Sequence, residues 1–558
     1  MRKPRVLWVG EATHLHTGYA VYGKEVLNRL WKTGKYEIAE QACYGDVGEP
    51  RRFDNPWGYY GNLPTNGPET EEYRNSPPHA FGRWRFERIA LDFKPDVVID
   101  IRDFWMVEHE GTSPYRRLYN WALMPTVDSE PQQEQWLSAY IDADAIFTYS
   151  KYGKDVLQSE SNNKVKFIDT APPGAAFNIF KPVQNKKDHK GAYGFVDDIN
   201  IVGTVMRNQA RKLYPDLLEA FKTFIEKYPA MGEKTFLYLH TAYPDSGWDI
   251  PYFLKRNNLG NKVLFTYVCP HCQYVFPSFF QDARTICRRC NNPSAILPNT
   301  SRGVDESQLA QILNCFDVYV QYSVCEGFGM PQVEAAACGV PVMAVNYSAM
   351  ESILKDIDGI PIDVERYFWD AGTSCRRALP SNNDFIEKLH NFLRKPKEMQ
   401  QKQGRNAMIG AIKHYNYDKT AAVWEKYLDS VPIYDGIWDS PPRIIHPNTN
   451  VPPGLTNDQF VRWVIINTLG EPEKLNSYMA LRMLRDLNYG EAFNGGREIS
   501  HNEASLLAMG VKMDPFSYSH VVERALDMAN KRNYFEQLRV GMIKESTPDF
   551  IKYAKKAE

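Results

Sequence analysis

Short apolar runs alternate with helix-like stretches along the first 430 residues. Residues 6–9 form a buried-strand pattern, a glycine-bounded loop follows, and residues 22–30 carry apolar side chains at helical spacing. Strands that alternate with helices are typical of parallel sheets with both faces covered. The pattern therefore predicts an α/β protein. Further strand-like runs lie at residues 96–99, 145–148, 199–203, 236–239, 263–265, 318–320 and 340–343.

Breaks in this pattern divide the chain into units. The segment Ala171-Pro-Pro-Gly174 interrupts the alternation and indicates a hinge. Six prolines between residues 432 and 456 indicate a linker, and a Thr456…Gln459 capping box precedes apolar residues at helical spacing. We expect an N-terminal Rossmann-like domain, a C-terminal one, an insert within it, a linker and a helical extension, over residues 1–175, 176–431, 266–298, 432–456 and 457–558.

Residues 45–85 depart from the alternation, because proline, glycine and aromatic residues are frequent there. Trp57, Tyr59, Tyr60 and Trp84 are among them. This composition predicts a long ordered loop or a lid rather than a packed element. Aromatic side chains stack on sugars and on nucleobases, so the segment suits either kind of ligand.

Composition narrows the functional classes. Of the 558 residues, 43% are hydrophobic and 24% are charged, which suits several buried cores and excludes wholesale disorder. Lys and Arg total 66 against 68 Asp and Glu, so the chain is not globally basic, although a local basic patch fits this balance. No run of 18 apolar residues occurs, and the N-terminal segment lacks the apolar core of a signal peptide. We expect a cytoplasmic protein without a transmembrane segment.

Two carboxylates mark the most informative segment, Glu326-Gly-Phe-Gly-Met-Pro-Gln-Val-Glu334, which continues as Ala-Ala-Ala-Cys-Gly-Val-Pro341. The glycines make its first part a loop, so Glu326 lies at the carboxyl end of the preceding strand and Glu334 lies on the next helix. Backbone amides of the loop and of the helix N-terminus are then free to meet hydroxyl or phosphate oxygens. The simpler interpretation is an ordinary βα turn with exposed carboxylates.

This segment resembles the E-x7-E motif of retaining nucleotide-sugar glycosyltransferases with the GT-B fold, in particular glycosyltransferase family 4. Companion segments follow in the family's order. Val202-Gly-Thr-Val205 with Arg207 and Lys212 resembles the family's strand, glycine loop and basic pair. The resemblance covers roughly residues 5–430 without the cysteine insert, and it implies two Rossmann-like domains that face each other across a cleft. Residues 143–150, 173–182 and 305–318 resemble the last strand of the first domain, the connector, and the helix and strand before E-x7-E.

The resemblance also implies roles at the sugar end of the donor. Glu334 would bind the donor ribose, and Glu326 would contact the donor sugar. The backbone amides of Gly327, Phe328 and Gly329 would bind the hydroxyls of that sugar. The acceptor hydroxyl would attack on the face that the diphosphate leaves, and a phosphate oxygen would take the proton. The implied activity is hexosyl or pentosyl transfer with retention.

Other residues are implied at the phosphate end. Arg207 and Lys212 would neutralise the diphosphate of a UDP- or GDP-sugar as the glycosidic bond breaks, so no catalytic metal is expected. By the same resemblance, Gly203 would belong to the donor-binding glycine loop of the second domain. Gly18 would let the first loop approach the phosphates, although the family's glycine pair reads Thr17-Gly18 in this chain.

The His-Asp pair that the family carries after a mid-domain strand is incomplete here. The matching loop is Met124-Pro-Thr-Val-Asp128-Ser-Glu130, so Asp128 fits the carboxylate position while Val127 stands where the histidine would be. Asp128 either orients the acceptor hydroxyl or caps the helix that follows. His14 and His16 in the first loop are candidates for the missing histidine, or they are ordinary loop residues.

Four of the nine cysteines form a C-x2-C, x14, C-x2-C array, Cys269, Cys272, Cys287 and Cys290. Two tight turns that each present two thiolates are typical of a zinc ribbon with a tetrahedral metal site. Four protein ligands leave no open position, so we expect structural rather than catalytic zinc. The other five cysteines are scattered, which indicates a reducing compartment.

The acceptor stays open between two classes. Arg284, Arg288 and Arg289 of the insert are interleaved with aromatic residues, a pattern that suits nucleic-acid phosphates and bases. Some bacteriophage-encoded glycosyltransferases modify hydroxymethylated bases in DNA, and the insert favours such an acceptor, in the host cytoplasm if a phage encodes the chain. The alternatives are a glycan or lipid-linked sugar in polysaccharide biosynthesis, an insert that only stiffens loops, or a non-catalytic sugar- or nucleic-acid-binding protein on a GT-B scaffold. A phosphorylase or epimerase of this fold is disfavoured by the E-x7-E motif.

Overall fold

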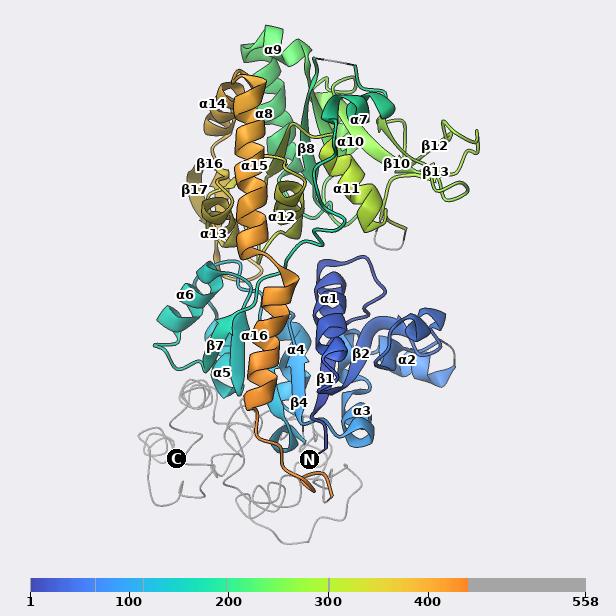
Figure 1. Cartoon of the computed structure of the whole chain (residues 1–558), viewed down its shortest axis with the longest axis vertical. Coiled ribbons are helices and arrows are strands. Elements are labelled where there is room, and N and C mark those ends of the chain that lie inside the picture. Colours follow the sequence, from blue (N-terminus) through green and yellow to red (C-terminus); the bar gives the residue numbers. More distant parts are fainter. Residues whose placement is uncertain (1, 66, 114, 197, 300–301, 440–558) are drawn as a thin grey trace, which may run out of the picture.

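The computed structural model describes residues 2–65, 67–113, 115–196, 198–299 and 302–439. They form two α/β halves stacked end to end, with the first strand in the lower half and the long C-terminal helices running down one side (Figure 1). The predicted helical extension over 457–558 and most of the predicted linker over 432–456 lie outside the described residues.

The first domain is built on a parallel seven-stranded sheet with the order β3-β2-β1-β4-β5-β6-β7. Its inner strand β1 is apolar on both faces, because helices cover both sides of the sheet. The strands are β1 (Arg5–Glu11), β2 (Glu37–Asp46), β3 (Gly58–Leu63), β4 (Val97–Asp100), β5 (Asn120–Leu123), β6 (Ala145–Thr148) and β7 (Phe167–Thr170).

Helices connect these strands, and α1 begins directly after the first loop. Thr17 caps it, since its side chain accepts a hydrogen bond from the Ala20 backbone amide. The helices are α1 (Gly18–Lys32), η1 (Pro50–Asp54), α2 (Pro68–Arg74), η2 (His79–Arg83), α3 (Phe86–Phe93), α4 (Phe104–Gly111), η3 (Arg116–Leu118), α5 (Glu134–Asp142) and α6 (Lys151–Glu160).

The segment 45–85 is a packed part of this domain, which corrects the prediction of a loop or lid. It contributes the edge strand β3 and three short helices. Trp57 and Trp84 are buried, and the Trp84 ring meets Tyr73 edge to face with ring centroids 5.6 Å apart. These aromatic residues therefore serve packing rather than an open binding surface.

The second domain is built on a nine-stranded sheet with the order β12-β13-β10-β9-β8-β14-β15-β16, in which β11 also pairs with β10. Six strands are parallel, and the three strands of the cysteine insert add antiparallel pairs at one edge. The strands are β8 (Asn200–Val205), β9 (Thr235–His240), β10 (Val263–Val268), β11 (Val275–Phe279), β12 (Arg284–Thr285), β13 (Ala295–Ile296), β14 (Val318–Gln321), β15 (Val342–Val345) and β16 (Ile360–Ile362).

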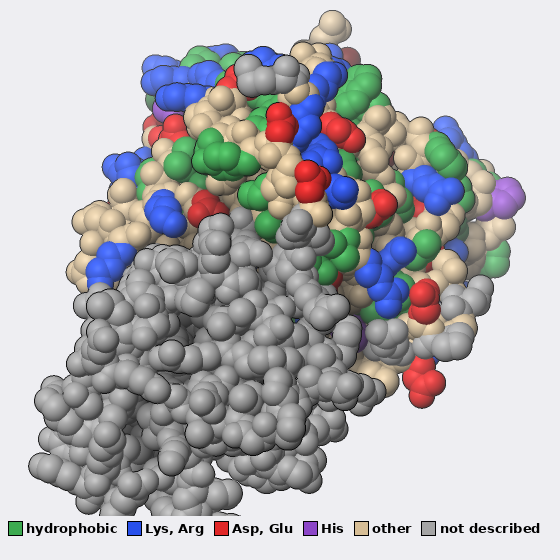
Figure 2. Space-filling view, turned by 90° about the horizontal axis from the view of Figure 1, so that it is seen from below, with side chains coloured by type: hydrophobic (Ala, Val, Ile, Leu, Met, Phe, Trp, Pro, Cys, Tyr) green, Lys and Arg blue, Asp and Glu red, His purple; other side chains and the backbone are tan. Residues whose placement is uncertain are grey.

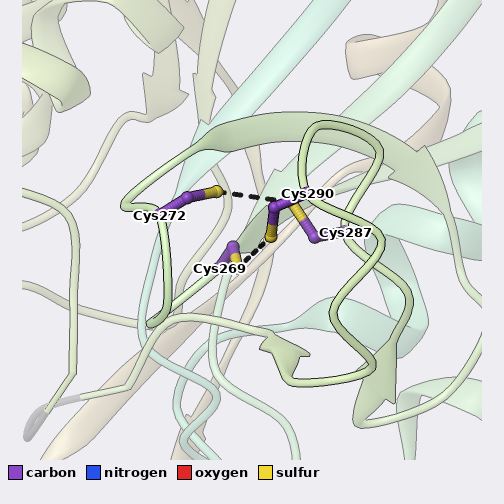
Figure 3. Close-up of side chains that lie close together, drawn as sticks. All are labelled: Cys269, Cys272, Cys287 and Cys290. Carbon is purple, nitrogen blue, oxygen red and sulfur yellow. Dashed lines mark hydrogen bonds between the residues drawn. The ribbon is translucent and has the colours of Figure 1, made fainter.

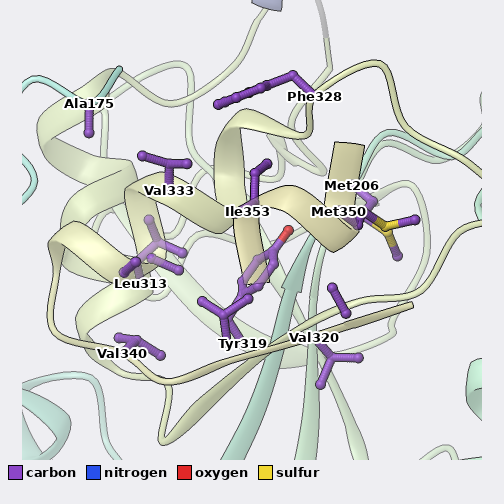
Figure 4. Close-up of a cluster of buried hydrophobic side chains, with 14 of the residues drawn as sticks. Ala175, Met206, Leu313, Tyr319, Val320, Phe328, Val333, Val340, Met350 and Ile353 are labelled. Carbon is purple, nitrogen blue, oxygen red and sulfur yellow. The ribbon is translucent and has the colours of Figure 1, made fainter. Parts of the chain in front are cut away.

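Buried apolar side chains join this sheet to its helices. Tyr319 and Val320 of β14 lie in one cluster with Val333 of α12 and Ile353 of α13 (Figure 4). A separate hairpin, β17 (Val364–Trp369) with β18 (Arg376–Pro380), follows β16. The helices are α7 (Lys186–Ala192), α8 (Tyr214–Lys227), α9 (Pro229–Glu233), α10 (Ile250–Arg256), α11 (Glu306–Asn314), α12 (Met330–Ala337), α13 (Ala349–Asp356), α14 (Asn382–Leu393) and α15 (Lys397–His414).

The last described helix, α16 (Tyr417–Ser430), returns from the second domain to the first (Figure 1). The Trp424 ring packs against Phe147 of β6 at a tilt of 32°, with ring centroids 4.0 Å apart, and its indole N–H donates to the Tyr22 hydroxyl over 2.8 Å. Residues 417–430 therefore pack with the first domain, although they follow the second domain in sequence.

Acidic and basic side chains both occur over the described surface seen from below, with apolar side chains scattered between them (Figure 2). Among the described helices, none combines the length and the apolar character needed to span a bilayer.

Candidate active site

The carboxyl ends of β8 and β14 form the centre of the candidate site. β14 lies on one side of β8 and β9 on the other, so the strand order reverses at this point. In open α/β sheets, ligands bind at such a reversal. Glu326 lies in the loop after β14, and Gly329 caps α12 with a φ of 91°, which a residue with a Cβ rarely adopts.

Glu326 is buried and has partners on both carboxylate oxygens. Arg211 Nη1 donates to its Oε2 over 2.7 Å, and Lys212 Nζ donates to its Oε1. Gln321 and Ser323 also donate to Oε1, over 2.5 and 2.8 Å. Burial would raise the pKa of Glu326, but Lys212 and Arg211 hold it well below its usual range. Glu326 is therefore a fixed negative charge between two cations.

The two cations differ in position and in chemistry. Burial and the adjacent Arg211 lower the pKa of Lys212 to about 8, against the attraction of Glu326. The Lys212 side chain is 6% exposed, whereas 41% of the Arg211 side chain is exposed. Arg211 therefore presents its charge to open space in front of Lys212. Sequence reasoning missed Arg211, although its adjacency to Lys212 in the same loop was a usable signal.

Arg207 and Lys212, the predicted basic pair, bind different carboxylates of the chain, and their common role at the diphosphate stays a prediction. The Arg207 guanidinium makes two hydrogen bonds to the Asp245 carboxylate, of 2.8 and 3.0 Å, while Lys212 binds Glu326. A two-pronged contact of this kind fixes the guanidinium plane. Arg211 rather than Arg207 stands beside Lys212.

Glu334 lies buried on α12 with no hydrogen bond from its carboxyl group to any other described residue. Burial, and after it the negative charge of Glu306, raises the pKa of Glu334 to about 8. The group is protonated at neutral pH and can both donate and accept a hydrogen bond. Its carboxyl is thus available to a ligand hydroxyl.

Two of the expected donor-binding glycines lie where the domains meet. A Cβ on Gly18, the first residue of α1, would come 3.5 Å from the Met330 sulfur at the start of α12. A Cβ on Gly327 would come 2.3 Å from the Thr126 methyl of the first domain. The start of α1 therefore lies close to the start of α12, and the glycine at position 327 lets the E-x7-E loop approach the loop after β5.

Gly203 and Phe328 have packing roles that the sequence did not indicate. A Cβ on Gly203, within β8, would come 2.1 Å from the Phe316 ring, so the strand needs glycine there for close packing. The Phe328 side chain is buried and meets Tyr415 edge to face, with centroids 5.4 Å apart. Neither residue has its side-chain position open to a donor, although the Phe328 amide is not affected by this packing.

A cavity of about 230 Å³ lies between the domains in front of Arg211. Burial, and after it the charge of Asp128, raises the pKa of Asp103 to about 7. Sequence reasoning missed Asp103, whose position after β4 gave no distinct motif. The cavity combines two carboxylates, two guanidinium groups and aromatic walls. Its lining is Tyr19, Asp103, Phe104, Trp105, Thr126, Asp128, Gln132, Trp136, Tyr140, Arg211, Gly327, Thr373 and Arg377.

Asp128 lines this cavity and is held by the second domain. Arg377 Nη1 of β18 donates to Asp128 Oδ1 over 2.6 Å and to the Ser129 hydroxyl over 2.9 Å. The Cys325 thiol lies 3.1 Å from Asp128 Oδ2. Asp128 is not a helix cap, because Gln133 is the N-cap of α5. The predicted helix-cap role is therefore wrong, and the predicted role toward the acceptor hydroxyl stays a prediction.

The candidate histidines lie elsewhere. His14 Nε2 is 3.4 Å from the Glu49 carboxylate, and burial lowers the pKa of His14. His16 is exposed in the same loop. Val127 is buried in the first domain's core. Of the described residues that line the cavity, none is a histidine.

The four predicted ligand cysteines come together in the insert (Figure 3). The sulfurs of Cys269 and Cys290 are 3.6 Å apart, as are those of Cys272 and Cys287, and all four lie within 4.8 Å of one another. Zinc–thiolate bonds of about 2.3 Å in a tetrahedron require sulfurs about 3.8 Å apart. The donor set therefore fits zinc and would enclose it completely.

The two cysteine turns have the same backbone design. In the first turn the Gln273 amide donates to the Cys269 carbonyl over 2.8 Å, and in the second the Asn291 amide donates to the Cys287 carbonyl over 3.0 Å. Gln273 and Asn291 also share a left-handed conformation, with φ of 56° and 55°. Each C-x2-C pair is thereby shaped to direct two thiols at one point.

Comparison with solved structures places this arrangement in a known architecture. Sucrose-phosphate synthase from Thermosynechococcus elongatus superposes with a TM-score of 0.56 at 17% identity, over 77% of this chain and 98% of that chain. HepE from Anabaena, solved in complex with UDP and glucose, gives 0.53 at 12% identity, over 76% of this chain and 100% of that chain. The chain has the GT-B fold. A glycosyltransferase from Rickettsia africae gives 0.53 at 13% identity, over 77% and 99%.

Sequence comparison finds one matching family model, which covers part of the second domain. Residues 301–408, which contain both glutamates of the E-x7-E motif, match the family model for glycosyl transferases group 1. No curated protein matches the sequence of the chain. The matched segment thus supplies Glu326, which binds Arg211 and Lys212 from outside the match.

Proposed function

We propose that the chain is a retaining glycosyltransferase that moves a sugar from a UDP- or GDP-sugar to an acceptor hydroxyl. The observation that carries the proposal is the pair of cations held by Glu326 at the strand reversal, beside a cavity lined by both domains. The group 1 match over residues 301–408 supports it, as does the presence of UDP and glucose in the Anabaena relative.

The residues divide the work of the transfer. Arg211 and Lys212 stabilise the diphosphate as its negative charge grows, while Glu326 keeps both side chains in place. The protonated Glu334 bonds the donor ribose. The acceptor hydroxyl enters the cavity near Asp128 and attacks on the face that the diphosphate leaves, and a phosphate oxygen accepts its proton. Domain packing excludes water from the donor, which favours transfer over hydrolysis.

The four cysteines hold a zinc ion that stabilises the insert and takes no part in bond breaking. Sulfur separations of 3.6 Å suit this ion, and its closed shell leaves no position for a substrate. The catalytic charge stabilisation is left to the arginine and the lysine.

The acceptor is a hydroxymethylated base in DNA. A cavity of about 230 Å³ admits one base or one sugar unit, and Trp105 and Trp136 among its lining residues can stack on an extruded base. A second candidate is a neutral glycan hydroxyl. The carboxylates of Asp103 and Asp128 favour it, because they accept hydrogen bonds from hydroxyl groups and repel phosphate.

Mass spectrometry of digested nucleosides tests the proposal. The protein is incubated with UDP- and GDP-sugars and with plain or hydroxymethyl-pyrimidine DNA, while nucleoside-diphosphate release is followed. A sugar mass on the hydroxymethylated base alone supports the DNA acceptor, and release with glycan acceptors alone supports the second candidate. Arg211→Ala should abolish either signal, and Arg405→Ala, at an exposed position of α15, should not. Nucleotide binding without release in any arm would identify a binding protein instead.

A further inference from the structure

A second cavity, of about 690 Å³, lies between the cysteine insert and the loops after β8 and β9. It is larger than the cavity between the domains and shares no residue with it. Its lining comes from the end of β8, from the loop after β9 and from the insert. The residues are Arg207, Ala242, Tyr243, Pro244, Asp245, Pro270, Ala283, Arg284, Ser294, Ile296, Leu297, Asn299 and Arg302.

The insert is joined to the sheet by strand pairing. β10 runs directly into Cys269, and β11 returns antiparallel along β10 from Val268 to Leu264. Ile296 of β13 pairs with Val268, and Arg284 of β12 pairs with Ile296. The insert therefore stands at the same sheet edge as the carboxyl ends of the parallel strands, where ligands bind in this architecture.

The charge around this cavity is positive. Arg207 is neutralised by Asp245, but no described carboxylate forms an ion pair with Arg284 or Arg302. The remaining walls include apolar residues such as Pro244 and Pro270. Unpaired guanidinium groups beside flat apolar walls suit a planar ligand with carbonyl oxygens or phosphate.

Two neighbouring arginines of the insert behave differently. Arg288 lies over the Phe276 ring at 5.4 Å, and Arg289 lies over the Tyr274 ring at 4.9 Å. Neither lines the cavity. Arg288 and Arg289 thus pack on aromatic residues of the insert, whereas Arg284 faces the cavity.

We propose that this cavity binds the nucleobase end of the donor nucleotide, with the cysteine insert as its outer wall. The inference rests on the proposed function and assigns the insert to donor recognition rather than to DNA. Arg207 connects this cavity with the proposed diphosphate site, because it lines the cavity and follows β8 only a few residues before Arg211 and Lys212. A volume of about 690 Å³ lies in the range of cavities that enclose small ligands of this size.

The geometry gives the metal site an indirect part in donor binding. The second cysteine turn lies in the connection between β12 and β13, and the first follows β10, whose last residue Val268 pairs with Ile296 of β13. Loss of the metal frees this wall and displaces Arg284. Metal removal should therefore weaken nucleotide binding while the two large sheets stay folded.

Calorimetric titration of the full chain with UDP and with GDP tests the inference. Arg284→Ala should weaken the preferred nucleotide about tenfold, the loss of one charge-assisted hydrogen bond. The matched control Arg289→Ala removes an arginine from the same insert and should stay within about twofold, since it loses no contact in the cavity. Chelation of the metal should weaken nucleotide binding at least as much as Arg284→Ala does. Metal analysis confirms that the metal is removed, and circular dichroism should show that the α/β spectrum is retained.

The outcomes separate this inference from the proposed function. A wild-type chain that binds neither nucleotide contradicts the proposed function itself. Wild-type binding that Arg284→Ala leaves unchanged overturns only the role of the insert. A single-stranded oligonucleotide serves as a second probe, and loss of its binding alone in Arg284→Ala would assign the cavity to nucleic acid and overturn the inference.

Discussion

Among single side chains, Lys212 and Arg211 carry equal charge but hold it over different pH ranges. Arginine keeps its proton throughout the accessible range, whereas burial and Arg211 lower the pKa of Lys212 to about 8. Lys212 is cationic below that value and neutral above it. In the free protein, the site therefore loses one of its two cations as the pH rises through about 8.

This difference predicts an alkaline limb in the pH profile of transfer. The value of kcat/KM, which reports the free enzyme, should fall about tenfold per pH unit above pH 8. Lys212→Arg should remove that limb, at a lower plateau because the larger side chain fits the buried position less well. Initial rates between pH 6 and about 10 provide the measurement. A wild-type profile that stays flat to pH 9.5 or so would contradict the assigned role.

Glu334 makes a separate prediction about stability. Its pKa is about 8 in the folded chain and near 4.5 when exposed, so the folded state keeps a proton that the unfolded state releases between these values. Stability from this group is fully present below about pH 4.5 and is lost as the pH rises to about 8. Glu334→Gln removes this titration. Between pH 6 and 8, the free energy of unfolding of the wild type should therefore fall by roughly 1–3 kcal/mol relative to that of the variant.

Urea unfolding at the two pH values measures this difference. Glu306→Gln is the informative control, because removing the Glu306 charge lowers the pKa of Glu334 and should shrink the pH dependence. Equal stability differences at both pH values would show that Glu334 is not protonated in the folded chain.

Some of these site residues could be predicted from the sequence, and others could not. Glu326, Glu334 and Lys212 belong to contiguous motifs, and the structure places Glu326 and Lys212 in contact. Arg377 had no such signal, because its contact with Asp128 joins positions 249 residues apart. Contacts of this kind depend on how two domains pack, which local patterns do not encode.

Among the elements, α16 shows how a helix can belong to a domain other than its sequence neighbours. Trp424 is fully buried, packs against the Phe147 ring and donates a hydrogen bond to Tyr22, and both partners belong to the first domain. Trp424→Ala should lower the free energy of unfolding by about 3–5 kcal/mol, since it leaves a cavity and two lost contacts. Trp31→Ala, at a side chain that is 44% exposed, is the matched control and should cost far less.

Denaturant unfolding followed by circular dichroism gives both values. A Trp424→Ala cost no larger than that of Trp31→Ala would mean that α16 is not an integral part of the first domain. The expected result is a selective loss of the first domain's transition.

The alternation of apolar runs predicted β1, β4 and β6 of the first sheet and β8, β9, β10, β14 and β15 of the second, and β2 is among the strands that it missed. This strand lies inside the sheet and still carries Glu40 and Gln41 as buried residues. Thr13 donates to Glu40 from its hydroxyl and its backbone amide, and Gln41 donates to the Gly82 carbonyl over 2.6 Å. Polar residues satisfied by distant loops break the apolar pattern, so periodicity alone does not find such a strand.

Over the whole molecule, the hairpin β17–β18 ties the second domain to the loop that carries Asp128. The Arg376 amide donates to the Glu130 carbonyl over 2.7 Å, and the Gln133 side chain donates to the Thr373 carbonyl over 2.6 Å. The Arg377–Asp128 pair is the most enclosed of these contacts and lies on the cavity wall. The hairpin therefore links domain closure to the shape of the acceptor cavity.

Arg377→Ala should separate donor binding from transfer. Donor affinity should stay unchanged, because Arg377 lies on the acceptor side, whereas turnover should fall about 10–100-fold as Asp128 loses its position. Small-angle scattering should show a larger radius of gyration with donor bound, since a buried charge is left unpaired in the closed form. Arg376→Ala removes the neighbouring exposed ion pair with Glu130 and should alter neither quantity.

A double variant decides whether Arg377 acts through Asp128. If it does, Asp128→Ala combined with Arg377→Ala should reduce turnover little beyond the single changes, because both remove the same contact. Independent roles would instead multiply the two losses. Arg377→Lys should recover part of the turnover, since a lysine keeps the charge but not the shared geometry with Asp128 and Ser129. Fully additive losses of turnover, together with an unchanged radius of gyration, would mean that the hairpin has only a structural role. A non-additive loss together with a larger radius of gyration would mean that the hairpin positions the acceptor side of the site.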